Sequence, residues 1–234
     1  AALLNRAGTW RLPYLITAAA CNPMAAVSAS LLRTDRPARQ HGTTVARRDV
    51  WTPVVMAAAA TFVFVGIGHS MILVTFSSWL EDVHGVSIGE LGLTAFVIGM
   101  AELAGSAGTA AVGDRVGLHR SLLLGLGGAA GASLLMLMGD AALWTALLTM
   151  AVYFVVVEYT IVGLLSLFSE VAREARGAAM GIAFAAFAIG HAAGAVLGTQ
   201  LFERVGMTEN LIGMSVAFAL AVVPARAVVP PEAL

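Results

Sequence analysis

The sequence has no lysine, and its single cysteine, Cys21, lies in an apolar segment. All 13 basic residues are arginine, so a protein that holds retinal through a lysine Schiff base is excluded. One cysteine also excludes a disulfide framework and a cysteine metal site. Charged residues make up 12% of the chain, against roughly 25% in soluble domains. Together with 59% hydrophobic residues, this composition predicts an integral membrane protein.

The sequence also lacks the short motifs of several enzyme classes. It has no phosphate-binding glycine loop with lysine, no His-Glu-x-x-His and no Gly-x-Ser-x-Gly. These absences argue against an ATP-driven pump and against a membrane protease. We therefore expect no enzymatic activity, no catalytic residues, no cofactor, no metal site and no nucleic-acid partner.

Seven apolar stretches are long enough to cross a bilayer, since a helix spans about 30 Å of hydrocarbon in about 20 residues. The expected fold is therefore an all-α integral membrane protein. Pro53 falls in the first turn of the second stretch, where a missing N–H group costs little. The stretches cover residues 10–32, 50–80, 88–112, 121–138, 141–168, 178–202 and 210–228.

Arginine sets the expected orientation of these spans. Ten of the 13 arginines fall in loops on one side, five of them in the segment 33–49, and the positive-inside rule places that side in the cytoplasm. The C-terminus would then be cytoplasmic. A lipid-binding or nucleic-acid patch is the alternative interpretation of segment 33–49, but topology alone demands such charge. The tryptophans predict an interfacial aromatic belt: Trp10, Trp51, Trp79 and Trp144.

A charged loop follows the third span and reads Gly113-Asp114-Arg115-Val116-Gly117-Leu118-His119-Arg120. Gly117 fits a turn with positive φ. Acids and arginines at such a helix junction can pair with each other or with helix ends, and so hold one conformation. The alternative is a topological anchor with an ordinary turn. The candidate residues for the conformational contact are Asp114, Arg115, Gly117 and Arg120.

This loop resembles the signature loop of the major facilitator superfamily, whose pattern is Gly-x-x-x-Asp-Arg/Lys-x-Gly-Arg-Arg/Lys. Asp114, Arg115 and Gly117 match the pattern. The positions that depart from it are Ala110, Leu118 and His119.

Other stretches resemble the same family in the same order. Residues 10–14 resemble the start of its sixth helix, and residues 176–181 resemble the Arg-Gly opening of its eleventh. The stretches 101–105 and 158–162 are similar to a bacterial drug and sugar efflux-permease branch. The resemblance implies that the seven spans correspond to helices 6–12 of a twelve-helix transporter.

The resemblance also implies a domain organisation. Residues 1–32 would hold the last helix of the N-terminal half with its preceding loop, 33–49 the cytoplasmic linker, and 50–234 the C-terminal six-helix half. The chain begins with Ala1 and has no signal-peptide pattern, so we expect the rest of the N-terminal half to precede it. Such halves contain two inverted three-helix repeats.

The implied function is secondary transport: proton-coupled efflux of a small organic solute by alternating access, in the inner or plasma membrane. The expected partners are that solute, protons, the lipid bilayer and the N-terminal half. An uncoupled facilitator is one alternative. The other is a seven-span protein that does not transport, such as a sensor, an assembly subunit or a membrane-embedded enzyme; the Asp-Arg-x-Gly loop favours transport over it.

Four ionisable side chains fall inside the apolar spans, where a charged group costs about 2.5–3.5 kcal/mol to insert. All four are therefore candidates for the substrate and proton pathway: His69, Glu102, Glu158 and His191. Glu158 is the strongest candidate, because its one-turn neighbours are apolar and a partner must come from another helix, from water or from a substrate. It could exchange a proton or bind a cation. The alternative is a structural glutamate hydrogen-bonded to a neighbouring helix.

The other three candidates have small residues nearby. Ser106 lies one turn from Glu102, and Gly99 and Gly105 predict close helix contact, which favours a structural role for Glu102. His69 is either a pH-responsive group or a satisfied interfacial histidine. His191 adjoins a small-xxx-small pattern that predicts tight helix packing, formed by Gly190, Gly194 and Gly198.

Overall fold

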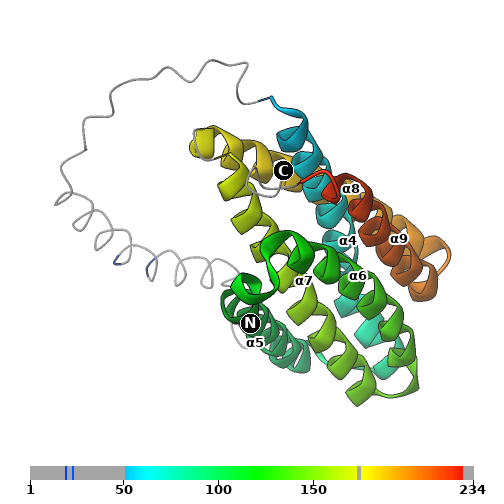
Figure 1. The fold of residues 1–234 in the computed structure, drawn as a ribbon. Helices are drawn as coiled ribbons and strands as arrows, with labels where there is room; N and C mark the ends of the chain where they lie inside the picture. The colour runs from blue at the N-terminus through cyan, green and yellow to red at the C-terminus, as the bar shows by residue number, and fades with distance from the viewer. Residues whose placement is uncertain (1–18, 20–22, 24–50, 173–174, 229–234) are drawn as a thin grey trace.

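We describe a computed structural model over residues 19, 23, 51–172 and 175–228. Within these residues the chain forms six long α-helices and one short 3₁₀ helix, η1 (Figure 1). The predicted first span and the predicted linker, 10–32 and 33–49, lie outside the described residues apart from two isolated positions. The elements are α4 Pro53–His84, α5 Ile88–Val116, α6 Leu118–Leu135, η1 Met136–Ala141, α7 Leu143–Val171, α8 Arg176–Arg204 and α9 Met207–Ala225.

All six long helices are long and apolar enough to cross a membrane. They correspond to the six predicted spans after the first, with ends that differ by a few residues. The division of the chain into an N-terminal segment, a linker and a six-helix half remains a prediction, because its first two parts lie outside the described residues.

Local signals explain where the first helices begin and end. The Thr52 side chain accepts a hydrogen bond from the Val55 N–H at 3.2 Å, and Pro53 occupies the first turn of α4, as predicted. Gly85 ends α4 with a φ of 65°, a conformation that glycine adopts without strain. Two residues later, Ser87 and Glu90 form a capping box that begins α5.

The junction between α6 and α7 differs from the prediction. The predicted span 121–138 is split, with α6 ending at Leu135 and η1 covering Met136–Ala141. Gly139 makes room for the Trp79 ring against η1, because a Cβ there would lie 2.5 Å from that ring. The Trp79 indole N–H donates to Asp140 Oδ1 at 2.9 Å, and a His84 ring nitrogen lies 3.0 Å from the Gly139 carbonyl oxygen.

The prediction that Trp79 belongs to an interfacial belt is therefore wrong. Its side chain is 1% exposed, because it packs on η1 rather than facing lipid headgroups. Trp51 and Trp144 are 55% and 81% exposed at helix ends, as the prediction requires. Trp10 lies outside the described residues.

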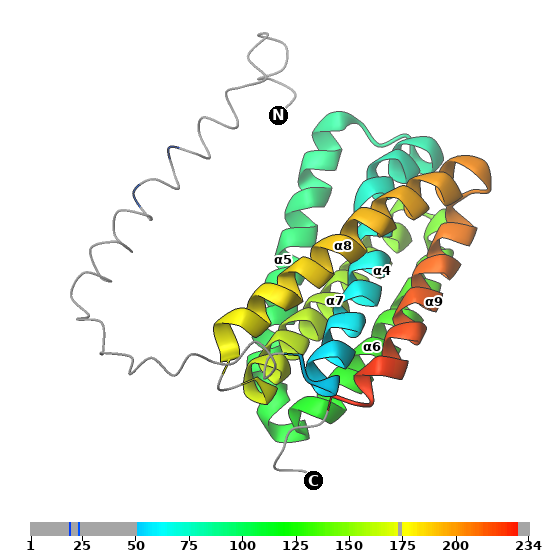
Figure 2. The ribbon, with the colours of Figure 1, turned by 90° about the horizontal axis from the view of Figure 1, so that it is seen from above.

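The helices pack in a pattern that repeats itself. The most extensive contact joins α4 and α8, and α8 crosses α4 diagonally in Figure 2. If α4, α5 and α6 are matched in order with α7, α8 and α9, then the α4–α8 contact corresponds to α5–α7, and α4–α9 corresponds to α6–α7. All four contacts are among the larger ones in the described residues. This exchange agrees with the predicted pair of three-helix repeats.

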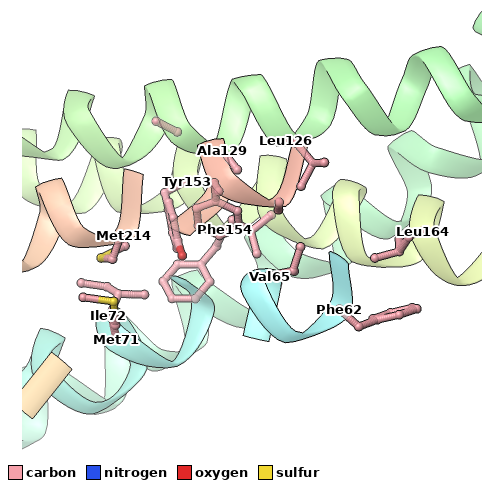
Figure 3. Packing of buried hydrophobic residues seen from close by; sticks show 14 of the residues in the cluster. Phe62, Val65, Met71, Ile72, Leu126, Ala129, Tyr153, Phe154, Leu164 and Met214 are labelled. Carbon is pink, nitrogen blue, oxygen red and sulfur yellow. The ribbon is translucent and has the colours of Figure 1, made fainter. Parts of the chain in front are cut away.

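The core lies where α4, α6, α7 and α9 meet, and Figure 3 shows labelled side chains of all four helices gathered there. Tyr153 is fully buried in it, and its hydroxyl donates to the Gly68 carbonyl at 3.3 Å. The Thr160 hydroxyl donates to the Val156 carbonyl of its own helix at 2.7 Å. Both side chains therefore serve packing and hydrogen bonding within the bundle.

Candidate functional site

The four predicted pathway residues all lie near the middle of their helices, which is the level farthest from both helix ends. His69 lies in α4, Glu102 in α5, Glu158 in α7 and His191 in α8. The arginines of these helices lie in their first or last turns. The structure brings the four residues together as two pairs, one of carboxyls and one of imidazoles.

The carboxyl pair lies between α5 and α7. Ser106 Oγ of α5 donates to Glu158 Oε1 of α7 at 2.9 Å. Glu102 lies one turn before Ser106 on the same helix. Both glutamates are half-buried. The partner of Glu158 thus comes from another helix, as predicted. The alternative interpretation, a structural glutamate hydrogen-bonded to a neighbouring helix, requires the same contact.

Two further hydrogen bonds beside this pair join α5 to α7 and α7 to α6. The Thr109 hydroxyl donates to the Tyr159 carbonyl at 3.0 Å, and the Tyr159 hydroxyl is hydrogen-bonded to Ser121 Oγ. Ser121 is fully buried near the start of α6. Sequence reasoning missed these bonds, although Ser106 and Thr109 stand on the same helix face as Glu102.

The sequence predicts close helix contact around Glu102, at Gly99 and Gly105. Ser106, one turn from Glu102, donates its hydrogen bond to Glu158 of α7. Gly105 makes the predicted close contact: a Cβ there would overlap the Val155 carbonyl oxygen. Within the described residues no such contact is found for Gly99, where a Cβ would meet nothing within 4 Å.

The imidazole pair lies between α4 and α8. The ring centroids of His69 and His191 are 5.4 Å apart. The Phe187 ring lies 4.9 Å from His191 and 6.3 Å from His69, and the Phe154 ring meets His69 edge-on at 6.0 Å. His69 is 8% exposed. Sequence reasoning named both histidines but did not pair them.

The glycines beside His191 form the predicted packing interface. A Cβ at Gly190 or Gly194 would overlap the carbonyl oxygen of Val63 or Ile67, and a Cβ at Gly198 would lie 2.7 Å from Met71 Cα. The three glycines therefore bring the backbones of α4 and α8 into direct contact.

The charged loop between α5 and α6 turns at Gly117, whose φ of 86° confirms the predicted positive-φ turn. Arg115 and Arg120 are exposed, and the Asp114 side chain lies outside the described residues. The His119 Nδ1 atom lies 2.8 Å from the Val228 carbonyl oxygen, which joins the loop to the segment after α9. Whether the loop holds one conformation stays a prediction.

A surface pocket of about 510 Å³ lies at the opposite helix ends. Its wall includes Trp79, Asp82, Asp140 and Glu203. None of the four mid-helix ionisable residues lines this pocket.

Comparison with known proteins adds one finding. A family model described as Major Facilitator Superfamily matches residues 1–195. The matched range includes both the carboxyl pair and the imidazole pair. No curated protein matches the chain.

Proposed function

Since the chain belongs to the major facilitator superfamily, whose members are membrane transporters, we propose that it exports a small organic solute in exchange for protons. The efflux-permease resemblance of residues 101–105 and 158–162 supports the direction and the bacterial branch. The arginine distribution supports a cytoplasmic C-terminus in an inner or plasma membrane.

The carboxyl pair carries the proposal. Glu102 and Glu158 stand at mid-helix level of the α5–α7 interface, with Ser106, the donor to Glu158, one turn after Glu102, and the described helices carry no arginine at this level. A carboxylate in the apolar part of a membrane favours a proton or a cationic group as its partner. A solute with a positively charged group would compete with that proton for the same carboxyls.

Alternating access would then proceed by rocking of the six-helix half against the N-terminal half. The backbone contact between α4 and α8 would make these two helices move together. Ser106 of α5 gives Glu158 a polar neighbour on the facing helix, and the Tyr159–Ser121 bond separately joins α7 to α6.

The test uses the full-length protein in proteoliposomes, with ethidium as a fluorescent organic cation and a trapped pH indicator. We expect a pH gradient to drive ethidium flux in the wild type. Glu158→Gln should abolish this coupled flux, because an amide cannot exchange the proton. The matched control is Glu170→Gln in the last turn of the same helix, which should retain it.

Two outcomes would contradict the proposal. If Glu158→Gln leaves both flux and its pH dependence intact, Glu158 is a structural residue. If wild-type flux is independent of the pH gradient, the protein is an uncoupled facilitator.

A further inference from the structure

His69 of α4 and His191 of α8 each have one ring nitrogen without a partner. His69 Nδ1 and His191 Nε2 are buried, and neither has a hydrogen-bond partner within the described residues. A buried polar atom without a partner is costly, and such atoms are rare in folded proteins. The ring centroids are 5.4 Å apart, so the two atoms belong to one location in the α4–α8 interface.

The surroundings of the two rings favour their neutral forms. The neighbouring rings are those of Phe154 and Phe187, and the Glu158 carboxylate of α7 is bonded to Ser106 of α5. An apolar interface disfavours a charged imidazolium that has no counter-charge beside it. The other ionisable side chains of the two helices lie toward their ends: Glu81, Asp82 and His84 of α4, and Arg176, Glu203 and Arg204 of α8.

Two neutral rings can satisfy each other. A neutral imidazole has one N–H donor and one nitrogen acceptor, so one ring can donate to the other. A linear N–H···N bond of about 2.9 Å would place the ring centroids about 5 Å apart, close to the 5.4 Å in the structure.

The glycines of this interface determine the register of α8 on α4 only in part. Three glycines of α8 face three residues of α4 at intervals of four on both helices: Gly190 faces Val63, Gly194 faces Ile67 and Gly198 faces Met71. A shift of α8 by one turn in either direction would therefore again set a glycine opposite two of the three α4 residues. At the third, the shift would bring in Ala186 or Phe202.

The histidine pair distinguishes the observed register from both shifted ones. A shift of four residues moves His191 about 6 Å along α4, which separates the rings and leaves both nitrogens without a partner. The α8 residues that would take its place are Phe187 and Ala195, whose side chains have no hydrogen-bonding group. Fixing the register of packed helices is the best-attested role of a single buried polar contact.

We propose that His69 Nδ1 and His191 Nε2 form a hydrogen bond between two neutral rings, and that this bond selects the register of α8 on α4. The glycines bring the two backbones together, and the histidines determine which turn of α8 meets which turn of α4. The proposal concerns the folded structure of the six-helix half and does not rest on the proposed transport function.

The first experiment detects the bond. Wild-type full-length protein with ¹⁵N-labelled histidine is studied in lipid bilayers by solid-state NMR at about pH 7. We expect a scalar coupling between two histidine rings that both have the nitrogen shifts of neutral imidazole. His191→Leu should abolish this coupling, and the matched control His84→Leu, at the end of α4, should retain it. Absence of the coupling in the wild type, or a positively charged ring in the coupled pair, would overturn the proposal.

The second experiment measures the register as the distance between two spin labels on the full-length protein. Cysteines replace Met56 of α4 and Leu197 of α8, which are exposed and lie toward opposite ends of the helix pair, after every native cysteine has been replaced by serine. Both labels lie on the six-helix half, so rocking of that half against the N-terminal half leaves their distance unchanged. A one-turn shift of α8 would change the distance by about 5–6 Å.

We expect one distance in the wild type and a second one, shifted by that amount, in the His69→Leu, His191→Leu double variant. His191→Gln is the matched control, because its amide can still bond His69 Nδ1, and it should keep one distance. If the double variant does not fold, His191→Leu alone is measured with the same expectation. A single unchanged distance without the histidines, or a second distance in His191→Gln, would overturn the proposal.

These results are separable from the proposed transport function. Glu158→Gln should retain both the histidine coupling and the single distance, even though it abolishes coupled ethidium flux. Coupling and a single distance in a wild type that shows no flux would leave the register proposal intact and overturn only the transport proposal.

Discussion

The α4–α8 and α5–α7 interfaces occupy equivalent places in the two helix triples, and their contacts correspond residue by residue. Gly190 of α8 faces the Val63 carbonyl of α4, as Gly105 of α5 faces the Val155 carbonyl of α7. One turn further, Gly194 faces the Ile67 carbonyl. At the corresponding place, the Thr109 hydroxyl donates to the Tyr159 carbonyl at 3.0 Å.

The buried stripes of α8 and α5 also share one spacing of four, three, four, four and four residues, although their composition differs. In α8 the stripe holds only alanine and glycine, whereas in α5 it includes larger and hydroxyl side chains. The α8 stripe is Ala179, Ala183, Ala186, Gly190, Gly194 and Gly198, and the α5 stripe is Thr94, Ile98, Ala101, Gly105, Thr109 and Gly113.

This correspondence matches Gly66 with Glu158 and His191 with Ser106. At this matched pair of positions the ionisable residue therefore stands on α8 in one interface and on α7 in the other, and in each case the residue opposite is small. The comparison teaches that the same pairing of two helices can carry an imidazole or a carboxyl. The ionisable side chain comes from the helix whose partner has a small residue opposite it. Both interfaces have a glycine against a carbonyl oxygen, and the α5–α7 interface adds hydrogen bonds from Ser106 and Thr109.

The largest expected effect comes from filling the α4–α8 interface. Gly190→Ala and Gly194→Ala should each lower the free energy of unfolding by about 2–3 kcal/mol, because the new Cβ would overlap a carbonyl oxygen that cannot rotate away. Thermal unfolding of the purified protein measures this. The control is Gly181→Ala in the same helix, where a Cβ meets no described atom within 4 Å and a change of no more than about 1 kcal/mol is expected. Equal stability of Gly190→Ala and Gly181→Ala would contradict backbone contact.

A smaller effect is expected at the corresponding glycine of α5. Gly105→Ala should lower the free energy of unfolding by about 1–2 kcal/mol, because the α5–α7 contact is less extensive and can separate more easily. It should also weaken the Glu158–Ser106 contact and hence coupled flux. Gly99→Ala, on the open face of α5, serves as control in the same unfolding assay. A larger loss at Gly105 than at Gly190 would reverse the comparison.

The smallest effect should come from removing one hydroxyl. Ser106→Ala should cost about 1 kcal/mol, since Glu158 loses its hydrogen-bond donor. Ser166→Ala is the matched control, because the Ser166 hydroxyl donates to the Val162 carbonyl of its own helix at 2.9 Å. If both variants unfold at the same temperature, the interhelical bond adds nothing to stability.

Sequence patterns predict the features that depend on one helix at a time. The six spans, the packing role of Gly190, Gly194 and Gly198, and the turn at Gly117 all follow from composition and spacing. The meeting of His69 with His191 does not, because it depends on the rotation and relative shift of α4 and α8. A shift of one residue turns a side chain by about 100° around its helix. The burial of Trp79 could not be predicted for the same reason, since its hydrogen-bond partner Asp140 is 61 residues away in the sequence.

The kind of atom that each glycine faces determines which genetic suppressors can exist. A substitution at Gly190 or Gly194 meets a main-chain oxygen, which every amino acid carries, so no exchange at positions 63 or 67 can restore the fit. A substitution at Gly68 meets the Phe218 ring instead, and one at Gly125 meets the Thr160 hydroxyl. A selection for revertants should therefore find second-site changes at positions 218 and 160, and only same-site reversion for positions 190 and 194.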